Sequence, residues 1–242
     1  MSAPVQDPEL LARLTRPGLV PVVVIDDARA AGSLGDALVA GGLPVAEVTL
    51  RTAAGVESLR RLADRGDLLV GAGTVLTPDQ VDEAVGAGAG FVVSPGLSRP
   101  VVERCLELGV LVLPGAVTAS EIQSALELGL TTVKFFPAES SGGVAAVQAL
   151  SAPFGAVSFL PTGGIGPANL ADYLSLPAVR AVGGSWMVPR ESIGDTARLS
   201  VLVEQAARLA SQLRPAGPAS GRSGQRRPDE RSMTGRVQVT AS

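Results

Sequence analysis

Short apolar runs rich in valine, isoleucine and leucine alternate with longer alanine- and leucine-rich stretches along most of the chain. The short runs predict buried strands, and the longer stretches show the spacing of amphipathic helices, with proline near several helix starts and glycine after several ends. Eight strands are predicted, at residues 19–25, 45–50, 68–74, 91–94, 111–114, 132–136, 158–161 and 181–184. The helical stretches include residues 77–87, 99–108, 119–128 and 167–174, and an extra helix at residues 7–14 precedes the first strand.

The alternation of strands and helices indicates an α/β fold with a parallel sheet. Eight predicted strands close most economically into a (β/α)8 TIM barrel, with an open doubly wound sheet as the alternative. We expect the barrel domain to occupy residues 1–213. Residues 214–242 are rich in Pro, Gly, Ser and Arg and too poor in apolar residues to fold alone, so a disordered C-terminal tail is predicted there.

Composition narrows the class of protein. The chain has 242 residues, of which 46% are hydrophobic, and a formal net charge of -3 at pH 7. These values suit one enzyme-sized globular domain, and without a basic, aromatic-rich stretch they predict no nucleic-acid partner. The first residues lack the features of a signal peptide, and no apolar run approaches the ~20 residues that span a bilayer, so we expect a cytoplasmic protein without a membrane partner.

Histidine is absent from the chain, and Cys105 is its single cysteine. The commonest general base and the commonest metal ligand are therefore missing. One thiol cannot form an intrachain disulfide, and Cys105 lies in a helical stretch among apolar residues, which favours a core position in a reducing compartment. No metal site is predicted, and no other cofactor is expected.

Lys134 is the only lysine in the chain, and it lies inside the apolar run at residues 132–137. That run predicts a buried strand. Burial disfavours the charged form of a lysine, so a buried amine can attack a carbonyl carbon and form a Schiff base, which arginine cannot do. The alternative is a structural lysine that forms a buried ion pair.

Charged and polar residues alternate with apolar ones in the second predicted strand. Side chains along a strand point alternately to opposite faces, so Glu47, Thr49 and Arg51 share one face. In a barrel this face points inward, where branched apolar residues are the rule and a buried charge is costly. The pattern predicts active-site groups. The alternative, a strand with one solvated polar face, fits a parallel sheet poorly.

Two glycine-rich segments follow the last two predicted strands, Pro161-Thr162-Gly163-Gly164-Ile165 after the seventh and Val182-Gly183-Gly184-Ser185-Trp186 after the eighth. Barrel enzymes often bind a substrate phosphate with these two loops, through backbone N–H groups that glycine allows to approach the anion. Either glycine pair alone is more typical of a tight turn, whereas the two together indicate a phosphate site.

The third and fourth predicted strands also lead to candidate site residues, because barrel active sites lie at the carboxyl ends of the strands. Thr74 ends the third strand, and Pro95 follows the fourth. The Thr74 hydroxyl could donate to a bound carboxylate or cap the following helix.

Taken in order, these segments resemble the class I 2-keto-3-deoxy-6-phosphogluconate aldolases, which also act as 4-hydroxy-2-oxoglutarate aldolases. The likeness runs from about residue 10 to about residue 213 without a large gap, and such a succession of motifs is highly specific. The matching segments are Glu47-Val48-Thr49-Leu50-Arg51, Val70-Gly71-Ala72-Gly73-Thr74-Val75-Leu76, Ser94-Pro95-Gly96-Leu97, Val133-Lys134-Phe135-Phe136-Pro137-Ala138-Glu139, Pro161-Thr162-Gly163-Gly164-Ile165 and Gly183-Gly184-Ser185-Trp186.

The resemblance implies a homotrimeric (β/α)8 barrel that cleaves a phosphorylated keto acid into pyruvate and glyceraldehyde 3-phosphate. It implies that Lys134 is the Schiff-base lysine and that Glu47 is the general acid and base. The remaining implied contacts fall into two groups. Arg51 and Thr74 would hold the substrate carboxylate end, with Pro95 lining that site and Phe136 packing beside it. The phosphate would be bound by Gly163, Gly164 and Ser185, with Thr162 nearby and Gly184 as a further substrate-binding residue.

Several alternatives stay open at this stage. A related aldolase for the galactonate epimer would use the same chemistry, and a phosphate-binding barrel isomerase or synthase would use Lys134 only to balance substrate charge. A non-enzymatic scaffold with a partner-recruiting tail is a third reading, against which the intact charged site residues argue. Residues 114–118 differ somewhat from the usual family motif, and preference between the sugar acid and 4-hydroxy-2-oxoglutarate is left undecided.

Overall fold

Parallel strands surrounded by helices make up the part of the chain that the structure, a computed structural model, describes, which is residues 6–213. The predicted tail at residues 214–242 lies outside the described residues. The strands are β1 Leu19–Val23, β2 Val45–Thr49, β3 Leu69–Gly73, β4 Phe91–Val93, β5 Leu111–Leu113, β6 Thr132–Phe135, β7 Ser158–Pro161 and β8 Val182–Gly184. The helices are α1 Pro8–Thr15, α2 Ala31–Ala40, α3 Gly55–Ala63, α4 Pro78–Gly86, α5 Arg99–Glu107, α6 Ala119–Glu127, α7 Gly143–Ser151, α8 Leu170–Leu174 and α9 Thr196–Leu213, with 3-10 turns η1 Ala28–Ala30, η2 Glu139–Ser141 and η3 Arg190–Ser192.

Each predicted strand is present, although several are shorter than the apolar run that predicted them. The first ends at Val23 rather than at residue 25, and the third covers Leu69–Gly73 rather than residues 68–74. The helix predicted at residues 167–174 is also shorter, because α8 covers only Leu170–Leu174. An apolar run can be longer than its strand because the first loop residues after the strand are also buried, as Ile25 is after β1.

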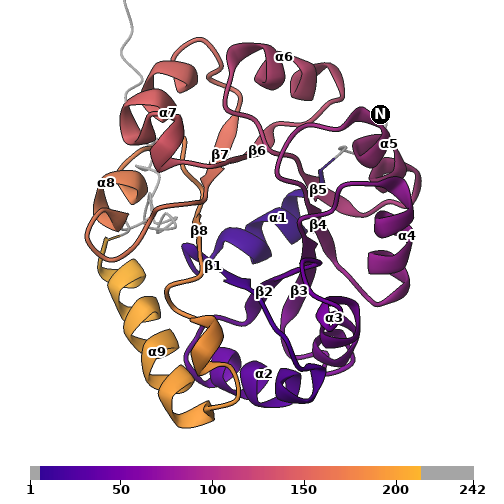
Figure 1. Cartoon of the computed structure of the whole chain (residues 1–242). Coiled ribbons are helices and arrows are strands. Elements are labelled where there is room, and N and C mark those ends of the chain that lie inside the picture. Colours follow the sequence, from indigo (N-terminus) through magenta and orange to yellow (C-terminus); the bar gives the residue numbers. More distant parts are fainter. Residues whose placement is uncertain (1–5, 214–242) are drawn as a thin grey trace, which may run out of the picture.

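The strands curve around a common centre, with the helices other than α1 outside them (Figure 1). Six strands pair in the order β5-β4-β3-β2-β1-β8, and β6 pairs separately with β7, all in parallel. Single parallel bridges join Gly115 to Lys134 and Thr162 to Gly183, next to the two gaps between these sheets. The predicted α/β class with a curved parallel sheet is therefore confirmed.

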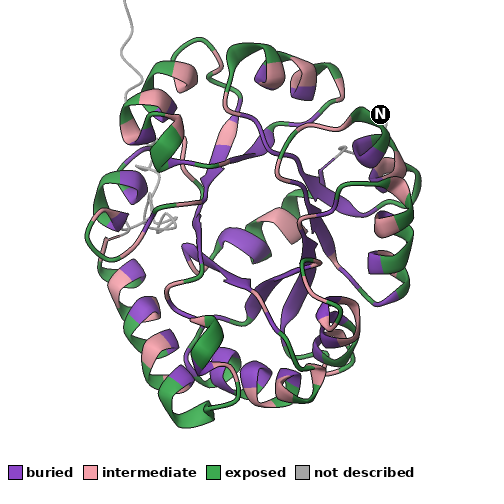
Figure 2. Ribbon diagram, in the orientation of Figure 1, coloured by how far each residue is buried: buried purple, intermediate pink, exposed green. Residues whose placement is uncertain are grey.

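Two apolar cores lie on opposite faces of the strands. The outer core packs the strands against the surrounding helices and includes Ala46 and Val48 of β2. The inner core contains Leu14 of α1, which lies across the centre of the ring in Figure 1. Strand residues of the inner core are Val20, Val45, Leu69, Phe91, Val93, Leu111, Leu113 and Leu160. Burial on both faces is typical of parallel sheets and matches the buried centre and exposed outer helix faces of Figure 2.

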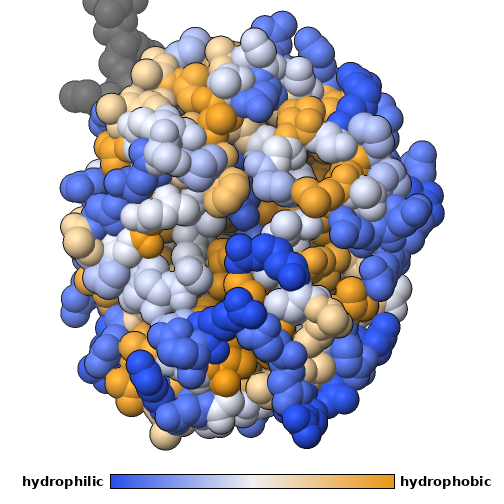
Figure 3. Space-filling view, viewed as in Figure 1, coloured by the Kyte–Doolittle hydropathy of each residue, from blue (hydrophilic) through white to orange (hydrophobic). Residues whose placement is uncertain are grey.

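Helix α1 begins where the sequence indicates. The Asp7 side chain accepts hydrogen bonds from the N–H groups of Glu9 and Leu10, and Pro8 occupies the first helical position. The outer rim of the molecule is largely hydrophilic in the space-filling view (Figure 3). None of the helices within residues 6–213 combines the length and hydropathy needed to cross a bilayer.

The gap between β5 and β6 is bridged by one side chain, that of Gln6. Its Nε2 donates to the carbonyl oxygens of Val112 and Thr132 at 2.8 and 2.9 Å, and its Oε1 accepts from the N–H groups of Thr131 and Thr132 at 2.9 Å each. Gln6 is buried, so these bonds replace strand-to-strand bonds that the two backbones do not make there. Sequence reasoning did not single out this residue.

Candidate active site

Lys134 and Glu47 form the centre of the site, on strands β6 and β2. The Lys134 Nζ donates to Glu47 Oε1 at 2.9 Å, and the two residues are 5% and 1% exposed. The neighbours of Lys134 in β6, Val133 and Phe135, belong to the outer core, so strand alternation directs Lys134 inward. The same alternation directs Glu47 inward, as the β2 pattern predicted.

The second Glu47 oxygen is the notable atom of this pair. Oε2 is buried and has no hydrogen-bond partner among the described residues. A buried carboxylate oxygen without a partner is costly, and such atoms concentrate at functional sites. On the other side of the pair, Lys134 Nζ lies 5.2 Å from the centre of the Phe136 ring, within the range of a cation–π contact.

Gly73, the last residue of β3, provides the space that the Glu47 side chain occupies. A Cβ at Gly73 would lie 2.6 Å from Glu47 Cγ and 2.9 Å from its Cδ, which is too close for two carbon atoms. Strands β2 and β3 are neighbours, with Glu47 paired to Gly71 in register. The sequence motif contained Gly73, but only the strand register shows what its missing side chain is for.

Arg51 follows β2 and is exposed. Its Nε donates to Thr49 Oγ1 at 3.4 Å, and the Thr49 hydroxyl donates to the carbonyl oxygen of Val23 at 2.9 Å. Thr49 is buried, so its hydroxyl connects Arg51 Nε to the backbone of β1 through two hydrogen bonds.

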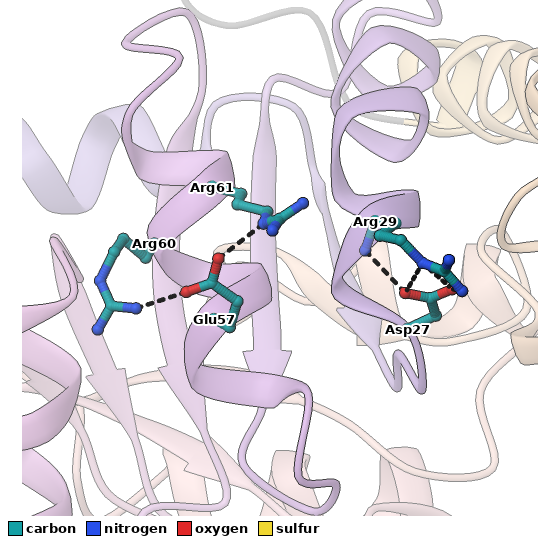
Figure 4. A network of polar contacts seen from close by, with 5 residues as sticks. All are labelled: Asp27, Arg29, Glu57, Arg60 and Arg61. Atoms are coloured by element: carbon teal, nitrogen blue, oxygen red, sulfur yellow. Dashed lines mark hydrogen bonds and ion pairs between the residues drawn. The ribbon is translucent and has the colours of Figure 1, made fainter.

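Two other arginines, Arg29 after β1 and Arg190 after β8, each form an ion pair with an aspartate. Arg29 pairs with Asp27, in the network that Figure 4 shows beside the Glu57 pairs with Arg60 and Arg61. The Arg29 side chain holds the pKa of Asp27 at about 2.

Arg190 after β8 pairs with Asp26 after β1, through bonds of 2.5 Å to each oxygen. These exposed ion pairs contribute little to stability. In contrast, Arg51 has no carboxylate partner among the described residues, so its guanidinium is available to an anionic ligand.

Thr74 is the only residue other than glycine with a positive φ within residues 6–213, at 60°. For a β-branched residue this left-handed conformation is strained, and such strain clusters at functional sites. The alternative role of Thr74 as a helix cap is wrong, because the N-cap of α4 is Thr77, whose side chain accepts from Gln80 N. Thr74 and Pro95 are half-buried, and neither forms a hydrogen bond with the Lys134 side chain in the described part of the chain.

The two glycine-rich loops lie next to the lysine strand. The N–H of Thr162 donates to Phe135 O at 2.9 Å, and Thr162 bridges to Gly183 of β8. Gly163 and Gly164 have φ values of 103° and 78°, which only glycine adopts readily. The N–H groups of Gly163, Gly164 and Ser185 have no partner within residues 6–213, which leaves three backbone donors in neighbouring loops.

The residues predicted from the sequence therefore divide into two sets. Lys134, Glu47 and Phe136 are in direct contact, and the loop at Thr162 adjoins them. Arg51, Thr74 and Pro95 follow the ends of β2, β3 and β4, and no hydrogen bond or ion pair joins them to the lysine–glutamate pair among the described residues. Within residues 6–213, no cluster of three or more side chains of the kinds that bind metals is present.

The fold and the buried lysine–carboxylate pair are those of an α/β enzyme with a lysine near the carboxyl ends of parallel strands. The profile of the KDPG and KHG aldolase family matches residues 10–202. The KHG/KDPG aldolase of Escherichia coli K12 is 46% identical over 196 residues, which cover 80% of this chain and 92% of the relative. The chain therefore belongs to the KDPG and KHG aldolase family, whose members are lyases.

Solved structures give the same result. The 2-keto-3-deoxy-6-phosphogluconate aldolase of Zymomonas mobilis ZM4 with 3-phosphoglycerate has a TM-score of 0.78 and 40% identity, covering 82% of this chain and 94% of that chain. The KDPG aldolase of Legionella pneumophila, with pyruvate captured as a covalent carbinolamine intermediate, has a TM-score of 0.78 and 39% identity, covering 86% and 98%.

Proposed function

We propose that this chain is a class I aldolase that cleaves 2-dehydro-3-deoxy-6-phosphogluconate into pyruvate and glyceraldehyde 3-phosphate through a Schiff base on Lys134. The observation that carries the proposal is the buried contact of 2.9 Å between Lys134 Nζ and Glu47 Oε1 in a member of this family. The Legionella relative supports it, because its structure holds pyruvate as a covalent carbinolamine.

The reaction begins when the neutral Lys134 amine attacks C2 of the keto acid. The carbinolamine loses water to give an iminium, which withdraws electrons from the C3–C4 bond. When that bond breaks, its electron pair moves to C3 and the iminium becomes an enamine, while the proton of the C4 hydroxyl leaves and the aldehyde forms. Protonation of the enamine at C3 and hydrolysis of the new iminium release pyruvate and restore the amine.

Glu47 is the group that moves the protons. Its Oε1 faces the Lys134 amine, and its unpartnered Oε2 is the acceptor for the C4 hydroxyl proton, directly or through one water. The same carboxyl group donates a proton to the carbinolamine hydroxyl as it leaves as water. A single group can serve both steps because the carbinolamine hydroxyl on C2 and the hydroxyl on C4 are only two carbon atoms apart.

The two ends of the substrate bind to the two remaining sets of residues. Arg51 and Thr74 hold the carboxylate, with Pro95 and Phe136 lining that end. The phosphate binds at the two glycine-rich loops. Its ligands are the unpartnered backbone N–H groups of Gly163, Gly164 and Ser185, and the site is completed by Thr162 and Gly184 beside them.

We further infer that the strands form one closed (β/α)8 barrel in a homotrimer. Support for closure comes from the single bridges Gly115–Lys134 and Thr162–Gly183 and from the Gln6 bonds across the seam. The trimer rests on the family resemblance and is tested by native mass spectrometry. The domain boundary at residue 213 and the cytoplasmic location stay predictions from the sequence.

A second substrate, 4-hydroxy-2-oxoglutarate, deserves the same assay, because the Escherichia coli relative is named for both substrates. It would be cleaved to pyruvate and glyoxylate by the same steps. Values of kcat/KM for the two substrates, and for the galactonate epimer of the phosphorylated one, establish the order of preference.

Trapping with pyruvate and sodium borohydride tests the central step. Because Lys134 is the only lysine, the intact mass of the protein reports on that side chain and the N-terminal amine alone. We expect one reduced pyruvate adduct, mapped to the peptide of Lys134, and none in a Lys134→Arg variant that folds. No adduct on the folded wild-type protein, or substantial cleavage by Lys134→Arg, would favour a phosphate-barrel isomerase or synthase instead.

A further inference from the structure

Glu139, outside the proposed catalytic pair, lies against the loop that is proposed to bind phosphate. Its backbone N–H donates to Gly163 O at 3.1 Å, and the preceding residue, Ala138, donates to Thr162 O at 2.8 Å. A Cβ at Gly164 would lie 2.7 Å from Glu139 Cβ and 2.6 Å from its Cγ. The Glu139 side chain therefore passes directly over the Gly164 backbone.

The Glu139 carboxylate ends on α8 rather than on the loop. Its Oε1 accepts a hydrogen bond from the hydroxyl of Tyr173, the only tyrosine of the chain, which is fully buried. Gly143 leaves room for this contact, because a Cβ there would lie 3.3 Å from Glu139 Oε1 and 3.4 Å from the Tyr173 hydroxyl. Burial raises the pKa of Tyr173, so the phenol remains a hydrogen-bond donor over the whole physiological range.

This arrangement places an acidic side chain beside a proposed anion site. No arginine or lysine forms an ion pair with Glu139 among the described residues, so its charge is not neutralised by a neighbour. A carboxylate that turned toward Gly163 and Gly164 would repel a phosphate dianion there. The Tyr173 hydroxyl instead holds the carboxylate at α8, while the Cβ and Cγ atoms of Glu139 pack beside Gly164.

We propose that Tyr173 is a positioning residue that determines the affinity for phosphorylated substrates, by holding the Glu139 carboxylate away from the phosphate. This inference rests on the proposed function, because it assumes that the two glycine-rich loops bind the substrate phosphate. It adds a specific claim, namely that the Tyr173–Glu139 bond affects the phosphate end of the substrate and leaves the Schiff-base end unaffected.

Three variants distinguish this role from a purely structural one, in which Tyr173 only stabilises the packing of α8. In Tyr173→Phe the carboxylate loses its donor and is free to approach the loop, so KM for the phosphorylated substrate should rise about tenfold or more. Its kcat and the rate of pyruvate trapping by borohydride should stay within about twofold of wild type, because pyruvate carries no phosphate. In Tyr173→Phe/Glu139→Gln the charge is gone, so KM should return to within about threefold of wild type.

The Glu139→Gln single variant supplies a test that does not depend on the tyrosine. The amide oxygen still accepts from Tyr173 and the negative charge is removed, so KM for the phosphorylated substrate should stay level or fall. A rise in KM in this variant would overturn the proposal, because it would mean that the charge itself supports the loop.

Two other results would also overturn it. One is a Tyr173→Phe variant that loses kcat and pyruvate trapping together with KM, which is the signature of a structural role. The other is a double variant whose KM stays as high as that of Tyr173→Phe. Failure of wild-type protein to form the pyruvate adduct would instead contradict the proposed function itself, so the two failures are distinguishable.

Discussion

Lys134 Nζ and Glu47 Oε1 lie 2.9 Å apart, although the two residues are 87 positions apart in the chain. Lys134 belongs to the two-stranded sheet β6-β7, and Glu47 belongs to the six-stranded sheet, so the contact crosses the interior between them. Replacing such a buried pair with apolar residues is often neutral or stabilising, so a buried pair is weak evidence for a stability role. A chemical role explains it better.

The first prediction concerns the proton-transfer role of Glu47. Glu47→Gln keeps the shape and a hydrogen-bond acceptor but removes the base, so kcat/KM should fall by about 100- to 10,000-fold. Cleavage of the phosphorylated substrate, followed by pyruvate release, measures the loss. The matched control is Glu127→Gln, an exposed carboxylate on α6 without an ion pair among the described residues, which should keep full activity. Retention of more than about a tenth of wild-type activity by Glu47→Gln would contradict the assignment.

The second prediction concerns the space that Gly73 leaves for Glu47. In Gly73→Ala the new methyl group would overlap the Glu47 side chain, so the carboxylate must shift away from Lys134. A displacement of this size should lower kcat by about tenfold to a hundredfold, while the protein still folds.

Gly86→Ala in α4 is the matched control, because a Cβ there has no neighbour within 4 Å. It should be active and no less stable than wild type, since alanine favours a helix over glycine. Equal activity of the Gly73 and Gly86 variants would show that Glu47 tolerates displacement and would refute the role given to Gly73.

The third prediction concerns the seam between β5 and β6. Gln6→Ala removes four hydrogen bonds and leaves the carbonyl groups of Val112 and Thr132 and the N–H groups of Thr131 and Thr132 without this partner. We expect the free energy of unfolding, measured in urea, to fall by about 2–4 kcal/mol. Each lost bond contributes about 1 kcal/mol, and relaxation of the strands recovers part of the loss. Gln148→Ala, at an exposed glutamine of α7, should change it by less than about 0.5 kcal/mol. An equal effect of the two substitutions would show that Gln6 does not hold the seam.

The fourth prediction concerns pH. Burial raises the pKa of the Cys105 thiol from 9.0 to about 12. Because the folded state favours the neutral thiol, its contribution to stability is complete below pH 9 and is lost progressively as the pH rises from about 9 toward 12. Urea unfolding at pH 8 and pH 10 should therefore show a larger loss of stability in wild type than in Cys105→Ala. An identical loss in both proteins would mean that Cys105 titrates normally when folded.

The sequence by itself determined which side chains face the interior and in what order they come. Strand alternation has a period of two, so the β2 pattern was enough to direct Glu47 and Thr49 inward, whereas Arg51 lies beyond the end of β2 and is exposed. The order of the glycine-rich motifs, together with the single lysine, indicated the protein family, and the comparisons confirm that family. These features are local and can be read along the chain.

Only the tertiary structure decided which of these residues meet. The contacts of Glu47 with Lys134 and Gly73, of Gln6 with β5 and β6, and of Tyr173 with Glu139 depend on strand register and on which loops become neighbours. Apart from Glu47 and Lys134, the residues in these contacts could not be assigned a partner from the sequence. A glutamine, a glycine or a tyrosine occurs at many kinds of position in proteins. Their roles follow from packing between distant segments, which depends on the whole chain rather than on any one stretch of it.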